Sequence, residues 1–383
     1  SFMESDDLVY RKLQKHLDRM PVGFPESKSG KDISILKELF TPEEAAIALE
    51  LSMLPEPLSR IFPRVKHLVI DEQNLENRLD SMKKRGLIMG KRKRIKDKSI
   101  KFYNNAQFAI GIYEMQLNRM SSGLAANFVS YFENDYPSEF IGRKNIPQVH
   151  TIPIHQSLKS ENSVSTYDDI KEVIGRNDGP IAILKCICKQ THDLAGDSCK
   201  KTELRETCFL LRGIAKQAIA SGIGREVSKD EFYKLLDVFE KEGLVVQPQN
   251  SMKPMLICFC CGCCCGVLNL VKKFPKPTEY YKSNYFASVD ADKCAGCGTC
   301  TTRCQMGAIS LSDEKAVVDP DRCIGCGLCT STCKTGAVTL NKRGDTVVPP
   351  KNNDELYQTI LMNKIGTFAA VKTMIKYKLG MKV

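Results

Sequence analysis

The sequence lacks the motifs by which many chains of this length bind a nucleotide or an organic redox cofactor. No G-x-G-x-x-G stands in a strand–turn–helix context, so the fingerprint of an NAD or flavin site is missing. A phosphate-binding P-loop is missing as well. Tryptophan is absent, and the five histidines are scattered. If the protein is an enzyme, its chemistry is therefore expected at a metal, at a thiol, or on a cofactor that a partner holds.

The sequence also shows no secretory signal and no long apolar run. Residues 1–20 are charged and polar, without the apolar core of a signal peptide. The most suspicious run, Met255 to Val271, is shorter than the roughly twenty residues that span a bilayer. Six of its residues are cysteines. We therefore expect no transmembrane segment, and we expect the cytoplasm, a reducing compartment that suits a chain rich in thiols.

Cysteine is what the sequence has in excess. Eighteen cysteines cluster along the chain instead of spreading as a disulfide framework would. Eight of them form two copies of C-x2-C-x2-C-x3-C, and the first cysteines of the copies lie 29 positions apart (323 − 294). The two-residue gaps let a tight loop aim three thiolates at one centre, while the fourth lies beyond the reach of that loop. Zinc sites use pairs of C-x2-C, so this spacing indicates iron–sulfur clusters.

The segment from Val289 to Leu340 resembles the bacterial two-cluster ferredoxins. A Val-Asp pair precedes each cysteine loop, and a Gly-Ala pair follows each fourth cysteine. The resemblance implies two [4Fe–4S] clusters with crossed ligands. The first would be held by Cys294, Cys297, Cys300 and Cys333, and the second by Cys323, Cys326, Cys329 and Cys304. The family's proline after each fourth cysteine is replaced by Gln305 and Lys334. Cluster binding should survive, because proline is not a ligand, but the local backbone hydrogen bonds and the reduction potentials should differ.

The other ten cysteines form two groups in the sequence. The first group is Cys186, Cys188, Cys199 and Cys208, and the second is Cys258, Cys260, Cys261, Cys263, Cys264 and Cys265. Four cysteines equal the ligand number of one cubane, and the groups flank one helical stretch, so they could also share a site. We expect at least one additional iron–sulfur cluster here. Zinc, a redox-active thiol pair and buried free cysteines are the alternatives.

The order of the predicted elements indicates a multidomain α+β protein. An N-terminal segment over 1–30, poorly ordered in its second half, precedes a winged-helix-like domain with further helices over 31–140. A cysteine-rich, helical middle domain over 141–275, the ferredoxin-like domain over 285–342 and a basic C-terminal helix over 352–383 follow. The expected helices cover 31–40, 41–53, 71–86, 106–140, 207–221 and 228–242, and a strand at 87–89, a turn over 90–99 and a return strand at 100–103 form a hairpin.

Positive charge is concentrated in that hairpin. The net charge is +11, and residues 83–101 contain ten lysines and arginines and one aspartate. Helices followed by a basic hairpin resemble winged-helix domains over residues 33–110. On nucleic acid, residues 72–85 would enter a groove, and Lys91, Arg92, Lys93 and Arg94 would contact phosphates. Nucleic acid is not the partner we expect, because such hairpins are often solvated loops and winged helices often contact proteins.

The whole arrangement resembles a group of ferredoxin-domain proteins from anaerobes. They combine a winged-helix-like region, a C-x-C…C…C segment, a cysteine-crowded loop and a terminal two-cluster ferredoxin. The expected function is electron transfer, as an oxidoreductase or a component of one, between a redox partner protein and a further cluster or thiol site in the middle domain. A small-molecule substrate could react there. The alternative is a redox-sensing winged-helix regulator that binds nucleic acid.

Overall fold

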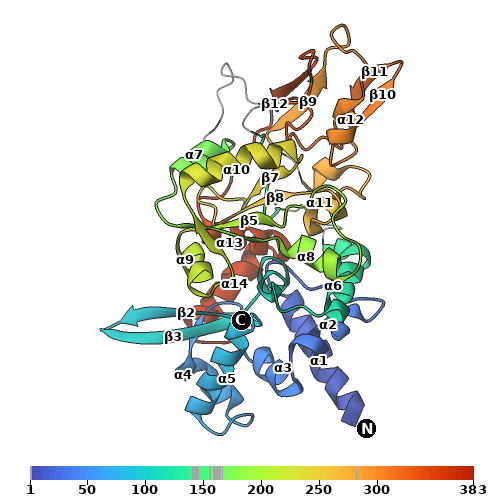
Figure 1. Ribbon diagram of the computed structural model, residues 1–383. Coiled ribbons are helices and arrows are strands. Elements are labelled where there is room, and N and C mark those ends of the chain that lie inside the picture. The colour runs from blue at the N-terminus through green and yellow to red at the C-terminus, as the bar shows by residue number, and fades with distance from the viewer. Residues whose placement is uncertain (1, 140–145, 155–156, 158–164, 166, 282) are drawn as a thin grey trace. The chain divides into compact units, whose positions relative to one another are not determined.

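The computed structural model divides the chain into two compact units, whose elements are drawn in Figure 1. It describes residues 2–139, 146–154, 157, 165, 167–281 and 283–383. One unit comprises residues 1–143 and 357–383, and the other comprises residues 144–356. The expected boundary between residues 140 and 141 lies outside the described residues.

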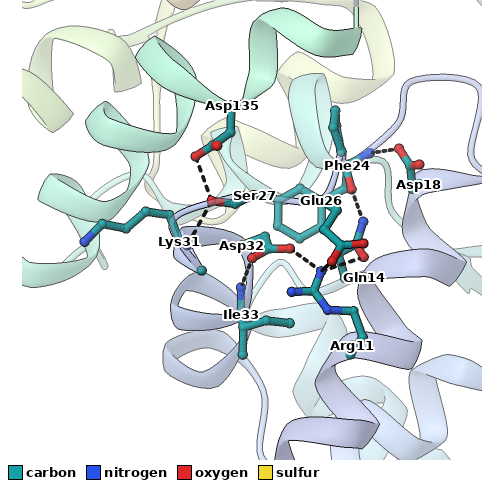
Figure 2. Close-up of polar contacts among 12 residues, drawn as sticks. Arg11, Gln14, Asp18, Phe24, Glu26, Ser27, Lys31, Asp32, Ile33 and Asp135 are labelled. Atoms are coloured by element: carbon teal, nitrogen blue, oxygen red, sulfur yellow. Dashed lines mark hydrogen bonds and ion pairs between the residues drawn. The ribbon is translucent and has the colours of Figure 1, made fainter.

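The N-terminal segment is a helix followed by a stretch that polar contacts hold in place (Figure 2). Helix α1 (Phe2–Asp18) carries Arg11, which donates a hydrogen bond to the buried carboxylate of Asp32 at 2.6 Å. Gln14 donates to the carbonyl of Phe24, also at 2.6 Å. The Ser27 hydroxyl donates to a carboxylate oxygen of Asp135 at 2.7 Å. These contacts and the complete burial of the Phe24 ring correct the expectation of poor order over residues 21–30.

Helices and a three-stranded sheet of order β1-β3-β2 follow in this unit. The predicted helix starts are confirmed: Thr41 and Glu44 form a reciprocal capping box, and Asp71 accepts a hydrogen bond from the Asn74 N–H at 2.7 Å. The elements are α2 (Lys31–Leu39), α3 (Pro42–Leu49), β1 (Glu56–Pro57), α4 (Leu58–Val65), α5 (Glu72–Lys84), β2 (Ile88–Ile95) and β3 (Lys98–Asn105).

The basic hairpin has a far shorter turn than predicted. Residues 90–95 and 98–99 belong to β2 and β3, and Ile95 pairs with Lys98. Lys96 and Asp97 make the turn with φ of 45° and 62°. Two consecutive positive φ values suit the right-handed twist of a hairpin, but the usual sequence signal is Asn-Gly or Asp-Gly. A Lys-Asp pair does not carry this signal. The sequence therefore predicted a long loop over residues that in fact continue the two strands.

The predicted helix over 106–140 is wrong in its first half. The chain forms short helical turns, η1 (Phe108–Ile112), η2 (Glu114–Gln116) and η3 (Tyr136–Glu139), around one α-helix, α6 (Ser122–Asn134). Ile110 has φ of 51°, which ends the helical pattern there. Phe108 stacks on Phe24 with ring centroids 4.4 Å apart, and Tyr131 of α6 lies 5.1 Å from Phe24. The apolar residues of this stretch thus form an aromatic core without a continuous helix.

The C-terminal region contains two helices where one was predicted. Helix α13 (Asn353–Ile365) ends at Gly366, whose φ is 82°, and α14 (Thr367–Lys378) follows. Within the first unit, the Lys364 ammonium donates to the carbonyls of Asp18 and Met20 at 2.6 and 2.9 Å. The Tyr377 hydroxyl donates to the carbonyl of Pro55. The end of the chain is therefore part of the unit that its beginning forms.

A five-stranded antiparallel sheet of order β6-β4-β5-β8-β7 forms the middle region, which was expected to be helical. The helix predicted over 207–221 begins at Arg212, because residues 206–211 form β5 with alternating exposure and burial. The helix after Ser228 is confirmed, with Ser228 as its cap. The elements are α7 (Ile170–Gly175), β4 (Ile181–Lys185), α8 (Ile187–Leu194), β5 (Glu206–Leu211), α9 (Arg212–Ala220), β6 (Arg225–Val227), α10 (Lys229–Lys241), β7 (Val245–Pro248), β8 (Leu256–Cys260) and α11 (Gly266–Val271).

Phenylalanines attach α10 to this sheet. Phe209 of β5 meets Phe232 with centroids 4.7 Å apart, and Phe259 of β8 meets Phe239 at 4.5 Å. Side chains alternate between the faces of a strand. Cys208, Cys258 and Cys260 therefore project from the face opposite to these phenylalanines.

The ferredoxin-like segment follows the short turn η5 (Pro277–Glu279) and repeats one plan twice. Strand β9 (Tyr285–Val289) pairs antiparallel with β12 (Val338–Lys342), and β10 (Ile309–Ser312) pairs with β11 (Lys315–Val318). The short helix α12 (Thr299–Arg303) lies within the first cysteine loop and contains Cys300. Each cysteine loop thus runs between one strand of each pair.

Candidate metal centres

The two ferredoxin-like loops fold tightly because a glycine in each packs directly against the backbone of another segment. Gly296 and Gly325 stand two residues after the first cysteine of their loops, with φ of 64° and 66°. A side chain at Gly296 would collide with the carbonyl of Glu314, and one at Gly325 with the carbonyl of Tyr285. Glycine accepts both the positive φ and this close approach. The glycines therefore let three thiols converge in each loop.

The fourth cysteine of each loop lies near thiols of the other loop. Burial first, and then the charges of Cys323 and Cys304, raise the pKa of Cys329 to about 12. Cys304 also contributes, after burial and Cys329, to the raised pKa of Cys326. Cys333 in turn interacts with Cys297. The structure thus brings the predicted crossed partners into the same neighbourhoods.

Backbone N–H groups donate hydrogen bonds to the sulfur atoms of these cysteines, as they do in iron–sulfur sites. The N–H of Ala308 donates to Cys304 Sγ at 3.2 Å. The N–H groups of Ala287 and Ala316 donate to Cys323 Sγ and Cys294 Sγ, both at 3.4 Å. Such donors stabilise a thiolate, which is the form of cysteine that binds metal, and they tune the potentials of iron–sulfur clusters. The donor set therefore fits two clusters.

The two loops differ in exposure. The first loop contains the exposed Cys297 and the buried Cys300, whereas the second contains two buried cysteines, Cys323 and Cys329, and no exposed one. The second loop also contacts the middle region, because the N–H of Ile154 donates to the carbonyl of Cys326 at 3.0 Å. The first loop thus reaches the surface of this unit at Cys297, and the second loop packs against Ile154 of the middle region.

Six cysteines of the middle region interact electrostatically in a closed series, which we call the six-cysteine ring. Strands β5 and β8 place Cys208 directly opposite Cys258. The members, in the order of these interactions, are Cys188, Cys186, Cys208, Cys258, Cys260 and Cys265, and Cys265 also interacts with Cys188. Hydrogen bonds from Cys188 and then Cys208 hold the pKa of Cys186 well below its usual value. A hydrogen bond from Cys208 is the main cause that lowers the pKa of Cys258 to about 5.

The other four cysteines of the middle region form a compact set, the four-cysteine set. It consists of Cys199, Cys261, Cys263 and Cys264, whose sulfur atoms all lie within 4.8 Å of one another. Cys199 follows α8 in the sequence, and the other three lie in the turn between β8 and α11. The two groups seen in the sequence are therefore mixed in space. Cys199 leaves the first group, and Cys258, Cys260 and Cys265 join Cys186, Cys188 and Cys208.

Two buried side chains that the sequence did not single out lie beside the six-cysteine ring. Lys189, 1% exposed, donates to the carbonyl of Leu204 and to the hydroxyl of Thr207, both at 3.1 Å. Its charge contributes to the low pKa of Cys186, after the thiol hydrogen bonds. Burial raises the pKa of Tyr281, which interacts with thiols of the ring, well above its usual value. Nothing in the sequence distinguishes Lys189 from an exposed lysine, because its burial depends on the packing of α8 against the sheet.

Gln305 occupies the position where the ferredoxin family has proline, and it joins the ferredoxin-like segment to the cysteine-rich turn. Its side-chain oxygen accepts from the N–H of Gly262 at 2.9 Å, and its side-chain nitrogen donates to the carbonyl of Gly243 at 2.7 Å. A side chain at Gly262 would collide with the carbonyl of Gln305. The sequence showed the departure from the family pattern but not the two partners.

The basic residues predicted to face phosphates are exposed, but they lie on a strand. Lys91, Arg92, Lys93 and Arg94 belong to β2, and all four are exposed. Charges at the base of the hairpin are already paired. Lys101 forms ion pairs with Glu76 and Asp80. The hairpin therefore offers fewer unpaired cations than the sequence count suggests.

Comparison with known proteins identifies one segment of the chain. Residues 288–337 match the family model described as a 4Fe–4S dicluster domain. No curated protein and no solved structure matches the chain. Among the described residues, no helix is both long and apolar enough to cross a membrane. The segment carries two [4Fe–4S] clusters, and the gathered cysteines of the middle region suggest a further iron–sulfur site. The chain thus contains a 4Fe–4S dicluster domain and has the features of an iron–sulfur electron-transfer protein.

Proposed function

We propose that this protein passes electrons between a redox partner protein and a metal–thiolate site in the middle region. One observation carries the proposal: the first loop contains the exposed Cys297, and Gln305, which follows Cys304, hydrogen-bonds to Gly262 inside the cysteine-rich turn of the middle region. When bound, each [4Fe–4S] cluster can take up and release an electron. The partner would dock at the exposed loop, around Cys297. A small-molecule substrate, if there is one, would react at the middle site.

Direct contacts support a path from the buried cluster into the middle region, because Cys304, the proposed fourth ligand of that cluster, lies between two residues that bind there. Gln305 follows Cys304 directly and hydrogen-bonds to Gly262, which lies inside the cysteine-rich turn. Arg303, on the other side of Cys304, donates to the carbonyl of Lys241 at 2.7 Å. These bonds anchor both neighbours of Cys304 to the middle region. A fixed, short separation between metal sites favours rapid electron transfer.

We further propose a ligand assignment for the clusters. The exposed cluster would be bound by Cys294, Cys297, Cys300 and Cys333, and the buried cluster by Cys323, Cys326, Cys329 and Cys304. The neighbourhood of Cys304 with Cys326 and Cys329 supports the crossed arrangement. The six-cysteine ring would hold the additional iron–sulfur cluster, since it offers more than the four thiolates that a cubane needs.

Substitution of Cys304 tests the crossed ligands. Cys304→Ala should perturb the electron paramagnetic resonance signal of the buried cluster and leave the signal of the exposed cluster unchanged. Cys333→Ala, at the matched position of the other loop, should do the reverse. Loss of the signal assigned to Cys294, Cys297 and Cys300 in Cys304→Ala would show that each loop keeps its own fourth ligand.

Electron counting tests the proposed function. Titrated anaerobically with a low-potential reductant, the protein should take up more than two electrons per chain, because two cubanes account for two and the middle site adds others. Cys258→Ala, which opens the six-cysteine ring, should reduce the uptake to two. An uptake of two electrons by both proteins would remove the middle site from the electron path.

A redox-sensing regulator is the second candidate, and the exposed basic hairpin is the observation that favours it. Helices α2 to α5 followed by the β2–β3 hairpin have the order of a winged helix. Lys91 to Arg94 are exposed on β2, and Arg94 also forms an ion pair with Asp97 at 3.5 Å. Binding of DNA would weaken with salt at a slope of roughly −0.9 per neutralised phosphate. A regulator must also prefer one sequence by about a thousandfold and lose that preference when its clusters are reduced. We expect neither in a genomic selection at physiological salt.

A further inference from the structure

The spacing of sulfur atoms separates the four-cysteine set from every other group of cysteines in the protein. Cys199 Sγ lies 3.7 Å from both Cys261 Sγ and Cys263 Sγ, and Cys263 Sγ lies 3.8 Å from Cys264 Sγ. In the part of the chain that the structure describes, no three thiols of the ferredoxin loops or of the six-cysteine ring lie within 4.8 Å of one another. The four-cysteine set is therefore more compact than the sets that belong to the cubanes.

This spacing suits one metal ion. Four thiolates bound tetrahedrally to a single zinc, with Zn–S bonds of about 2.3 Å, have sulfur atoms about 3.8 Å apart. In a cubane each thiolate binds a different iron, so the four sulfurs must lie farther apart. The eight thiols of the dicluster segment provide the comparison within the same structure, and they are more widely spaced. The geometry thus separates a single-ion site from a cluster site.

The surroundings of the set are those of a closed structural site. Cys199, Cys261 and Cys264 are buried, and Cys263 is half-buried. The N–H of Lys200 donates to the sulfur of Cys263, and such outer contacts orient metal ligands. All four ligands are thiolates, so no position stays open for water or substrate, as in structural zinc sites.

We propose that Cys199, Cys261, Cys263 and Cys264 bind one zinc ion, distinct from the iron–sulfur clusters. The ion would join the loop after α8 to the turn between β8 and α11. That turn also carries Gly262, which Gln305 holds, and Cys265, a member of the six-cysteine ring. Zinc has no redox chemistry, so the ion would fix the turn without accepting electrons.

Metal and sulfide analysis of anaerobically purified full-length protein tests the proposal. Wild type should contain one zinc per chain besides its iron. Cys263→Ser, at the least buried of the four ligands, should lose that zinc and keep its iron and acid-labile sulfide. Cys258→Ser, the matched change in the six-cysteine ring, should lose iron and sulfide and keep the zinc. Loss of about four irons and four sulfides from Cys263→Ser would overturn the proposal in favour of a cubane, and loss of one iron without sulfide would overturn it in favour of a single iron.

A second measurement uses the wild-type protein and therefore does not depend on whether a variant folds. Zinc-edge X-ray absorption of wild type should show four sulfur neighbours at about 2.3 Å and no oxygen or nitrogen neighbour. Oxygen or nitrogen neighbours around the zinc, or a wild-type protein free of zinc, would refute the assignment. The proposed electron transfer through the six-cysteine ring would stand in either case, because electron counting tests it separately.

Discussion

Replacing Gln305 by methionine should weaken the attachment of the dicluster segment to the cysteine-rich turn. Methionine has a similar length but makes neither hydrogen bond, so the N–H of Gly262 and the carbonyl of Gly243 would lose their partner. Gln305 is 9% exposed, which leaves little room for water to replace it. Each buried polar group left without a partner costs about 1–3 kcal/mol. For the two groups together we therefore expect the free energy of unfolding to fall by about 2–6 kcal/mol.

Lys334 provides the matched control, because it takes the corresponding place after the other fourth cysteine and is exposed. Lys334→Met should change the stability by less than about 0.5 kcal/mol. Anaerobic guanidinium unfolding, followed by cluster absorbance and circular dichroism, should show a midpoint lower by about 0.5–1.5 M for Gln305→Met, at a slope of about 4 kcal/mol/M. Equal midpoints for the two variants would refute the idea that Gln305 joins the two regions.

Three further changes test other features. Burial raises the pKa of Asp168 to about 6. The folded protein therefore binds a proton at Asp168 more tightly than the unfolded chain, whose aspartate has a pKa of about 4. The resulting stabilisation is complete below about pH 4, and up to about 3 kcal/mol of it should be lost as the pH rises through about 6. Thermal midpoints of Asp168→Asn should not show this fall. Lys189→Met removes a cation beside Cys186, and redox titration should show a middle cluster about 50–100 mV harder to reduce, from a charge interaction of about 1–2 kcal/mol. Asp71→Ala removes the cap of α5 and should cost about 1 kcal/mol in thermal unfolding.

The dicluster segment could be predicted because its information is local. Two-residue gaps and glycines at fixed offsets determine the loop, and the 29-residue repeat places the fourth cysteines. The helix starts at Thr41 and Ser228 were predicted for the same reason, because a cap and a glutamate stand three residues apart. The start at Asp71 was predicted because apolar residues at helical spacing follow a capping side chain.

The grouping of the other ten cysteines could not be predicted, because strand register determines it. Cys208 meets Cys258 fifty positions later (258 − 208) since β5 pairs with β8 in that register. This pairing was not predicted from the sequence, because the residues of β5 were interpreted as the start of a helix. A short apolar run fits either structure. The two-residue turn at Lys96 and Asp97 was missed for a different reason, since it lacks the glycine that usually marks such turns.

The division of the chain has a consequence for its synthesis. Residues 144–356, with all eighteen cysteines, are inserted into a unit that residues 1–143 and 357–383 build together. Domains generally fold as they leave the ribosome, from the N-terminus onward. The metal-binding unit can therefore be complete before Lys364 has been made, and until then the carbonyls of Asp18 and Met20 lack the ammonium that they accept from in the finished protein. Loading of the metal sites during translation would thus precede closure of the unit that surrounds them in sequence.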